Sequence, residues 1–134
     1  KERIMIERHW NAGLLAKTFG ALFVAVGLIG FTSNPFVSPT GYFMVNATHN
    51  FIHIVTGLAL IAGAMMHTPA MAIRAIAVLY AIVAVVGFGA PAMLAAVGID
   101  LNVADQWLHG LIAAGLLLIG FLTPAEESFS TAQM

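Results

Sequence analysis

Residues 46–66 of this chain read NATHNFIHIVTGLALIAGAMM, and this stretch decides the fold. It opens with polar residues, among them Asn46, His49 and His53, and then continues through apolar ones. A helix of about 20 mostly apolar residues is long enough to cross the hydrocarbon core of a bilayer. The stretch therefore predicts a transmembrane helix whose first two turns carry polar side chains.

The polar start of this stretch occurs a second time in the chain. Residues 46–53 read NATHNFIH and residues 102–109 read NVADQWLH, so the first Asn and the last His recur at one spacing. Polar groups inside a membrane are costly, so their repetition at a fixed spacing points to a site. We interpret the chain as two repeated helical hairpins, related by an axis along the membrane normal.

Three further segments are long and apolar enough to span a bilayer. The chain is 60% hydrophobic and 8% charged, whereas a soluble domain carries about 25% charged residues. We expect an all-α membrane protein, a single domain over residues 1–134, with the first helix retained and not cleaved as a signal peptide. The four transmembrane helices are predicted at residues 12–31, 46–66, 71–97 and 102–122.

Glycine and proline positions predict local features of these helices. Gly13, Gly20 and Gly27 recur at a spacing of seven, so they line one face of the first helix and let a neighbouring backbone approach. Gly89 and Pro91 lie in the outer third of the third helix, where we expect a kink.

Basic residues predict the orientation in the membrane. All five fall near the chain start or at the turn between the second and third helices: Lys1, Arg3, Arg8, Lys17 and Arg74. Loops rich in Lys and Arg stay in the cytoplasm, so we expect both termini there. Both polar motifs then lie near the outer face of the membrane.

Composition also excludes some functions. The formal net charge of −1 offers no basic surface for a nucleic acid. The absence of Cys excludes disulfides, thiolate metal sites and covalent c-type haem attachment. No nucleophile elbow, zinc-protease helix or phosphate-binding loop is present, so we do not expect an enzyme.

The candidate site consists of the polar residues of the two motif copies: Asn46, His49, His53, Asn102, Asp105 and His109. Residues four apart share one helix face, so we expect both helices to direct their motif side chains into the bundle. In the simplest interpretation the two asparagines cap their helices and the last histidine of each copy bonds across helices, holding the hairpins together.

Two alternatives give the same residues a ligand. His49, His53, His109 and Asp105 offer three nitrogens and one oxygen, a set that suits zinc or another divalent first-row metal ion. A single imidazole beside an open cavity can instead ligate haem iron, or the magnesium of a chlorophyll-type pigment. The residues alone do not choose between a structural, a metal and a pigment site.

The motifs resemble those of an uncharacterised bacterial family of four-helix membrane proteins, domain of unknown function 4383. The resemblance rests on FMVNATHNFIH at 43–53, on Gly57-Leu58 and on NVADQWLH at 102–109, and it spans residues 16–120. Gln106 stands where the pattern favours Asn. Membership implies a four-helix fold in a bacterial cytoplasmic membrane, but no established activity.

The leading functional prediction is a small non-enzymatic accessory or structural subunit. The loops are short and the polar chemistry is confined to one cluster, which is typical of a protein packed against other membrane subunits in the bilayer. The second prediction is a membrane protein that binds a metal, a haem or a pigment. The third is a sensor or transporter in which histidine protonation changes helix packing.

Overall fold

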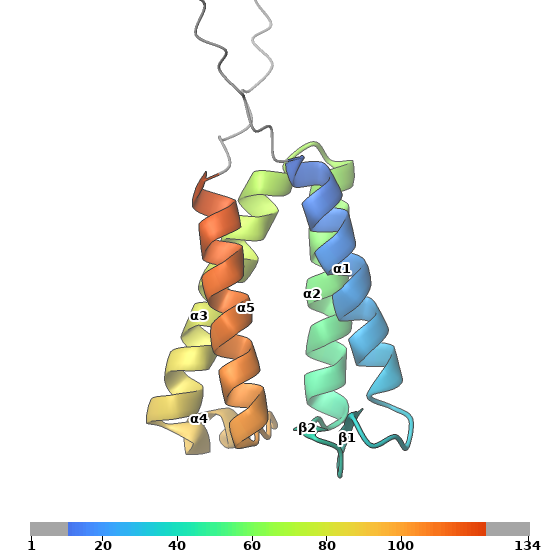
Figure 1. Ribbon diagram of the computed structural model, residues 1–134, viewed down its shortest axis with the longest axis vertical. Coiled ribbons are helices and arrows are strands. Elements are labelled where there is room, and N and C mark those ends of the chain that lie inside the picture. Colours follow the sequence, from blue (N-terminus) through green and yellow to red (C-terminus); the bar gives the residue numbers. More distant parts are fainter. Residues whose placement is uncertain (1–10, 123–134) are drawn as a thin grey trace, which may run out of the picture.

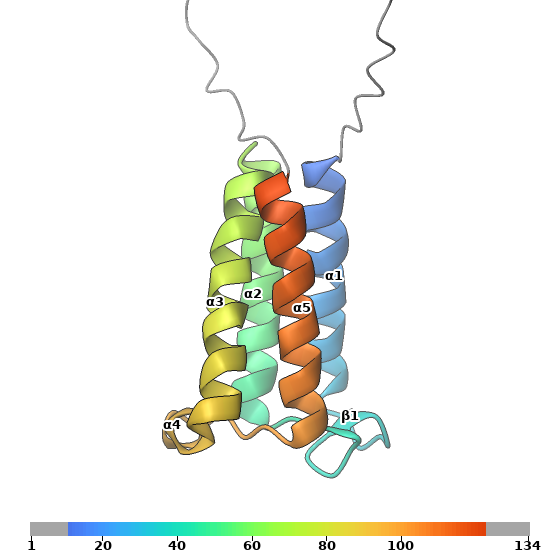
Figure 2. The same cartoon turned by 60° about the vertical axis from the view of Figure 1, so that its left-hand side comes forward.

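The computed structural model describes residues 11–122, and four of its helices are long and apolar enough to cross a membrane. They are α1 (Ala12–Ile29), α2 (Ala47–Met65), α3 (Pro69–Gly89) and α5 (Val103–Leu122), and they run side by side in Figures 1 and 2. The chain is thus an all-α membrane protein of four spanning helices. The predicted ends of the first, second and fourth helices differ from these by at most two residues.

The helices are arranged as two hairpins. α1 packs along α2 and α3 packs along α5, while smaller contacts from α3 to α2 and α1 join the pairs. Figure 1 shows the two pairs spread apart at the end where α2 and α5 begin. The hairpins match the predicted architecture; their origin as a repeat stays a prediction.

Glycines close the first hairpin. A Cβ placed on Gly20 would lie 2.7 Å from the Gly57 carbonyl oxygen, and one on Gly27 would lie 2.7 Å from the Asn50 carbonyl oxygen. The predicted small-residue face of α1 is therefore confirmed at these two positions, which let the α2 backbone approach closely. Gly13 meets only Asn11 of its own helix end.

The third predicted helix, residues 71–97, is wrong as a single element. α3 ends at Gly89, Ala90 leaves the helical region with φ −151° and ψ 60°, and Pro91 begins the separate short helix α4 (Pro91–Ala96). Proline disfavours helical backbone in the preceding residue and is well tolerated at a first helical position. The predicted kink is therefore a break.

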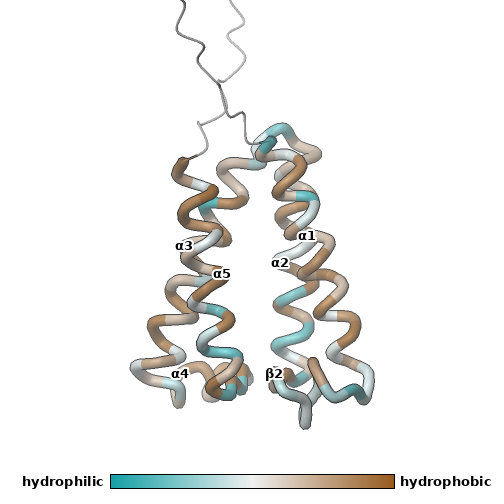
Figure 3. The backbone as a smooth tube through the Cα atoms, in the orientation of Figure 1, coloured by the Kyte–Doolittle hydropathy of each residue, from teal (hydrophilic) through white to brown (hydrophobic). Residues whose placement is uncertain are grey.

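The loop at residues 32–45 contains two short strands, one in contact with α1 and the other with α5. They are the two-residue parallel strands β1 (Val37–Ser38) and β2 (Phe43–Met44). Asn34 holds the loop together, because its Oδ1 accepts from the Phe36 and Val37 amides. Figure 3 shows hydrophilic backbone segments concentrated at this end of α2 and α5, beside the loop.

The ends of the described chain lie together at the opposite end of the bundle, as Figures 1 and 2 show. This agrees with an even number of membrane crossings. Lys17 and Arg74 lie on the halves of α1 and α3 nearer that end. The remaining basic residues, Lys1, Arg3 and Arg8, fall within residues 1–10, which lie outside the described part of the chain.

Candidate functional site

The start of α2 is fixed by Asn46. Its Oδ1 accepts a 3.0 Å hydrogen bond from the His49 amide, which caps the helix as predicted. Its Nδ2 donates to the Gly98 carbonyl at 2.9 Å and to Asp100 Oδ2 at 3.0 Å. The cap therefore sets the rotation of α2 and also ties this helix to the segment before α5.

The start of α5 repeats this arrangement. Asn102 Oδ1 accepts from the Asp105 amide at 2.9 Å, and Asn102 Nδ2 donates to the Tyr42 carbonyl at 2.8 Å. The second cap is thus confirmed, and it ties α5 to the loop that follows α1. Within residues 11–122 neither asparagine bonds to a histidine ring; both bond to backbone groups, and Asn46 bonds to Asp100 as well.

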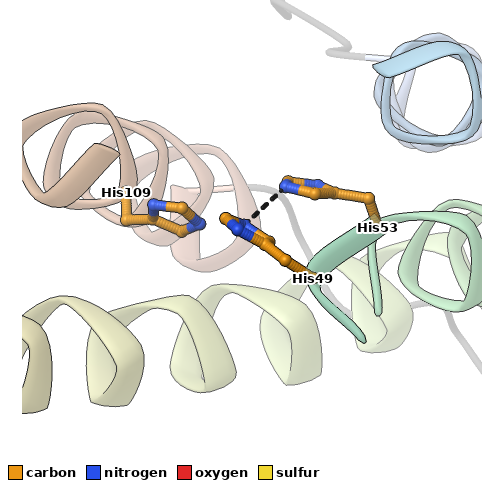
Figure 4. Close-up of side chains that lie close together, drawn as sticks. All are labelled: His49, His53 and His109. Carbon is orange, nitrogen blue, oxygen red and sulfur yellow. Dashed lines mark hydrogen bonds between the residues drawn. The ribbon is translucent and has the colours of Figure 1, made fainter. Parts of the chain in front are cut away.

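Three histidines from the two hairpins converge inside the bundle. His49 and His53 project from α2 and His109 projects from α5, and all three side chains are buried. One ligand nitrogen of each ring lies within 4.8 Å of the others. Figure 4 shows the three rings close together, with a dashed line between His49 and His53. The Nε2 atoms of these two rings are 3.0 Å apart. The prediction that His53 and His109 face the interior is confirmed.

Asp105 does not join this group of nitrogens. Its Oδ2 accepts from the Met44 amide at 2.8 Å and from the Asn102 amide at 3.2 Å. The carboxylate thus anchors strand β2 to α5. The sequence predicted Asp105 as a fourth metal ligand, but the metal-compatible group in residues 11–122 comprises the histidines alone. The difference arises because the hydrogen bonds from the Met44 and Asn102 amides hold the carboxylate toward the loop and the start of α5.

Hydrogen bonding assigns the tautomer of one ring. His109 Nδ1 lies 2.7 Å from the Asp105 carbonyl oxygen, which can only accept, so Nδ1 carries the proton. In the neutral ring Nε2 then bears the lone pair. Asp105 therefore supports the cluster through its backbone and not through its carboxylate.

The other two rings share a single hydrogen bond through their Nε2 atoms, so one of them donates and the other accepts. His49 Nδ1 is buried and makes no well-formed hydrogen bond in residues 11–122, although the ring interacts with the backbone of Met44 and Asp100. Buried polar atoms of this kind call for an explanation, and a bound water or ion is one.

Aromatic side chains from the remaining two helices surround the rings. Tyr80 of α3 places its hydroxyl 3.3 Å from His53 Nδ1 and stacks its ring on His109 at a centroid distance of 5.4 Å. Phe23 of α1 stacks on His53 at 5.6 Å. Sequence reasoning missed both residues. Tyr80 left one signal, since it is the only hydroxyl-bearing residue in 71–97.

A cavity of about 300 Å³ adjoins the cluster. Its walls are mainly apolar, whereas His53, Asp105 and His109 form its polar part. A pocket with apolar walls and a few convergent polar groups is the usual form of a small-molecule site. The apolar side chains come mostly from α1 and α5, and include Phe19, Leu22, Val26, Leu108 and Ile112.

The arrangement therefore offers three imidazole ligands and an adjoining apolar space. Comparison with curated proteins and with solved structures finds no match. The family model described as "Domain of unknown function (DUF4383)" matches residues 14–122. Because this match covers far more than half of the 134 residues, the chain belongs to the DUF4383 family.

Proposed function

We propose that this membrane protein binds one first-row transition metal ion through the histidine cluster. The observation that carries the proposal is the approach of three imidazole nitrogens, from two different hairpins, to within 4.8 Å. Imidazoles in a membrane interior need a compensating partner, and a shared metal ion satisfies all three at once.

The distances fit a metal with a small adjustment. Zinc binds histidine nitrogen at about 2.0–2.1 Å, which separates two ligand nitrogens by about 3.4 Å in a tetrahedral site. His49 Nε2 and His53 Nε2 are 3.0 Å apart, close to this value, and metal binding moves the proton between them to Nδ1 of the donor ring. The largest separation in the cluster is 4.8 Å. Metal binding therefore requires an approach of at most about 1.4 Å by the third ring.

The donor set favours particular ions. Three imidazoles without thiolate suit Zn²⁺, Cu²⁺ or Ni²⁺ better than Mg²⁺ or Ca²⁺, which prefer oxygen. The bond from His109 Nδ1 to the Asp105 carbonyl is the usual support for a metal-ligating histidine, since it orients the ring and leaves Nε2 as ligand. Three protein ligands leave one zinc coordination position open.

Metal analysis of the purified full chain tests this proposal. The protein is stripped with a chelator, reloaded with Zn²⁺ and desalted, and its bound zinc is measured by mass spectrometry. We expect about one zinc per chain, and we expect Co²⁺ in its place to give a tetrahedral absorption spectrum. A folded wild-type protein that retains neither Zn²⁺, Cu²⁺ nor Ni²⁺ overturns the proposal.

Two variants assign the metal to the cluster. His109→Gln removes one ligand, and we expect the stoichiometric zinc to be lost while circular dichroism shows an unchanged helix content. The matched control is His67→Asn, outside the cluster. His67 has a positive φ of 60°, which Asn tolerates. Equal zinc retention by His109→Gln and the wild type places the metal elsewhere.

We also propose the cellular setting that the sequence predicts: a subunit of a larger assembly in a bacterial cytoplasmic membrane, with both termini inside. The short loops and the four apolar helices support it. The exposed Thr40 lies at the end opposite the described termini, so Thr40→Cys should react with an impermeant thiol reagent from outside only. Labelling from the cytoplasmic side alone contradicts this orientation and places both termini outside.

Co-purification tests the subunit role. Mild detergent extraction of native membranes with a tagged chain should recover stoichiometric larger subunits. Recovery of the tagged chain by itself contradicts the role of accessory subunit and leaves the metal proposal untouched.

A further inference from the structure

The apolar cavity beside the histidines lies where α1 faces α5. These helices share almost no contact in the described chain, although each packs closely on its hairpin partner. Leu22 of α1 and Leu108 of α5 line the cavity, and Leu22 is 55% exposed. The mouth thus opens sideways, toward the surface that a bilayer covers. A molecule that enters this cavity therefore comes from the lipid phase.

The polar end of the cavity offers hydrogen-bond acceptors. Asp105 lines the cavity, and its Oδ1 makes no hydrogen bond in residues 11–122, because both backbone amides are bound by Oδ2. His109 donates through Nδ1 to a carbonyl, so in the neutral ring its Nε2 is an acceptor. A molecule in the cavity is complementary to this polar end if it carries a hydrogen-bond donor.

We propose that this cavity binds a lipid-soluble alcohol, with the apolar chain between α1 and α5 and the hydroxyl group donating to Asp105 Oδ1. This acceptor stays available whether or not the histidines hold a metal. The proposal thus concerns a second ligand and stands independently of the proposed function.

A matched pair of probes tests the donor. The purified full chain is placed in phosphatidylcholine vesicles with a long-chain alcohol that carries a photoreactive diazirine, or with the methyl ether of the same alcohol. Illumination followed by peptide mass spectrometry locates the crosslinks. Loss of one hydrogen bond lowers binding several-fold, so we expect about fivefold more crosslinking of cavity residues by the alcohol. Equal crosslinking by both probes overturns the proposal.

A matched pair of variants tests the place. Leu108→Trp places an indole ring in the cavity. Leu111→Trp places the same ring on the outer face of the same helix, where the Leu111 side chain is 70% exposed. We expect Leu108→Trp to abolish the alcohol's preference for residues such as Phe19 and Ile112, and Leu111→Trp to preserve it. Crosslinks spread evenly over the exposed residues of all helices mean solvation by the probe, which contradicts a site.

Chelator treatment separates the two proposals. The crosslinking is repeated on metal-stripped and zinc-loaded protein, and we expect the preference for the alcohol in both. Absence of zinc binding with intact alcohol crosslinking refutes the metal alone. Zinc binding without a preference for the alcohol over its ether refutes the alcohol site alone.

Discussion

The two hairpins begin their second helices with the same cap and then use the next motif position differently. In the first hairpin that position is His49, whose ring joins the histidine cluster. In the second it is Asp105, whose carboxylate turns to the loop and binds the Met44 amide. Equal spacing thus fixes where a side chain lies, and its chemistry decides whether it serves as a ligand or as a support.

The hairpins also differ in how tightly their helices meet. Gly20 of α1 and Gly57 of α2 each approach the other's carbonyl oxygen, so the first hairpin is closed by backbone contact. In the second hairpin an added Cβ on Gly120 of α5 would lie 3.2 Å from side-chain atoms of Ile73 and Arg74, and one on Gly115 would have no atom within 4 Å. The first hairpin is therefore the tighter unit, and the chemistry lies where the two units face each other.

Substitution of His49 and of Asp105, which occupy the same position in the two motif copies, gives the largest expected difference. His49→Ala removes a nitrogen from the cluster, so we expect stoichiometric zinc binding to be lost. Asp105→Asn changes a side chain outside the cluster and keeps the backbone carbonyl that orients His109, so zinc should be retained. Zinc analysis of both purified variants checks this. Equal loss in the two variants breaks the distinction between ligand and support.

The packing difference predicts the next largest effect. Gly20→Leu forces a side chain against the α2 backbone, 2.7 Å from the Gly57 oxygen at its Cβ, and we expect a loss of about 3 kcal/mol in unfolding free energy. Gly115→Leu has open space and should cost little. Thermal unfolding in one detergent compares them. If both midpoints fall equally, the first hairpin is not the tighter one.

The anchoring role of Asp105 predicts a smaller loss. Asp105→Ala leaves the amides of Met44 and Asn102 without their acceptor, and hydrogen bonds to a charged group contribute about 2 kcal/mol. Asp105→Asn keeps an oxygen acceptor and should lose less. Chemical unfolding of both variants measures the difference. If the alanine variant is as stable as the asparagine variant, the Asp105 side chain does not anchor β2 to α5.

The smallest effect concerns the two caps. Asn46→Ala and Asn102→Ala should each cost about 1 kcal/mol, the usual contribution of an N-cap. Asn46 should cost more, because its Nδ2 has two acceptors, the Gly98 carbonyl and Asp100, whereas Asn102 Nδ2 has one. Asn46→Ser keeps a capping oxygen and removes the amide donor without placing a second carboxylate beside Asp100, so it isolates the contribution of the Nδ2 bonds. A larger loss at Asn102 reverses the order.

The sequence predicts the four helices, both caps and the inward histidines, because helix length, capping chemistry and the four-residue spacing are local properties. The role of Asp105 is not local. It depends on Met44, which lies 61 residues away in the chain. Tyr80 and Phe23 escaped prediction for a related reason: continuous apolar sequence does not reveal which side of a membrane helix faces the bundle. The end of α3 at Gly89 follows from Pro91, and a kink was the weaker interpretation of the same residue.

The bond from the Met44 amide to Asp105 has a consequence for dynamics. An amide proton exchanges with solvent deuterium only while its hydrogen bond is open, so the protection of this proton reports the free energy of moving β2 away from α5. Val45, the next residue in the loop, is 2% exposed and lines the cavity beside the histidines. Slow exchange at Met44 then means that the loop end of the cavity beside the imidazoles is rarely open to water.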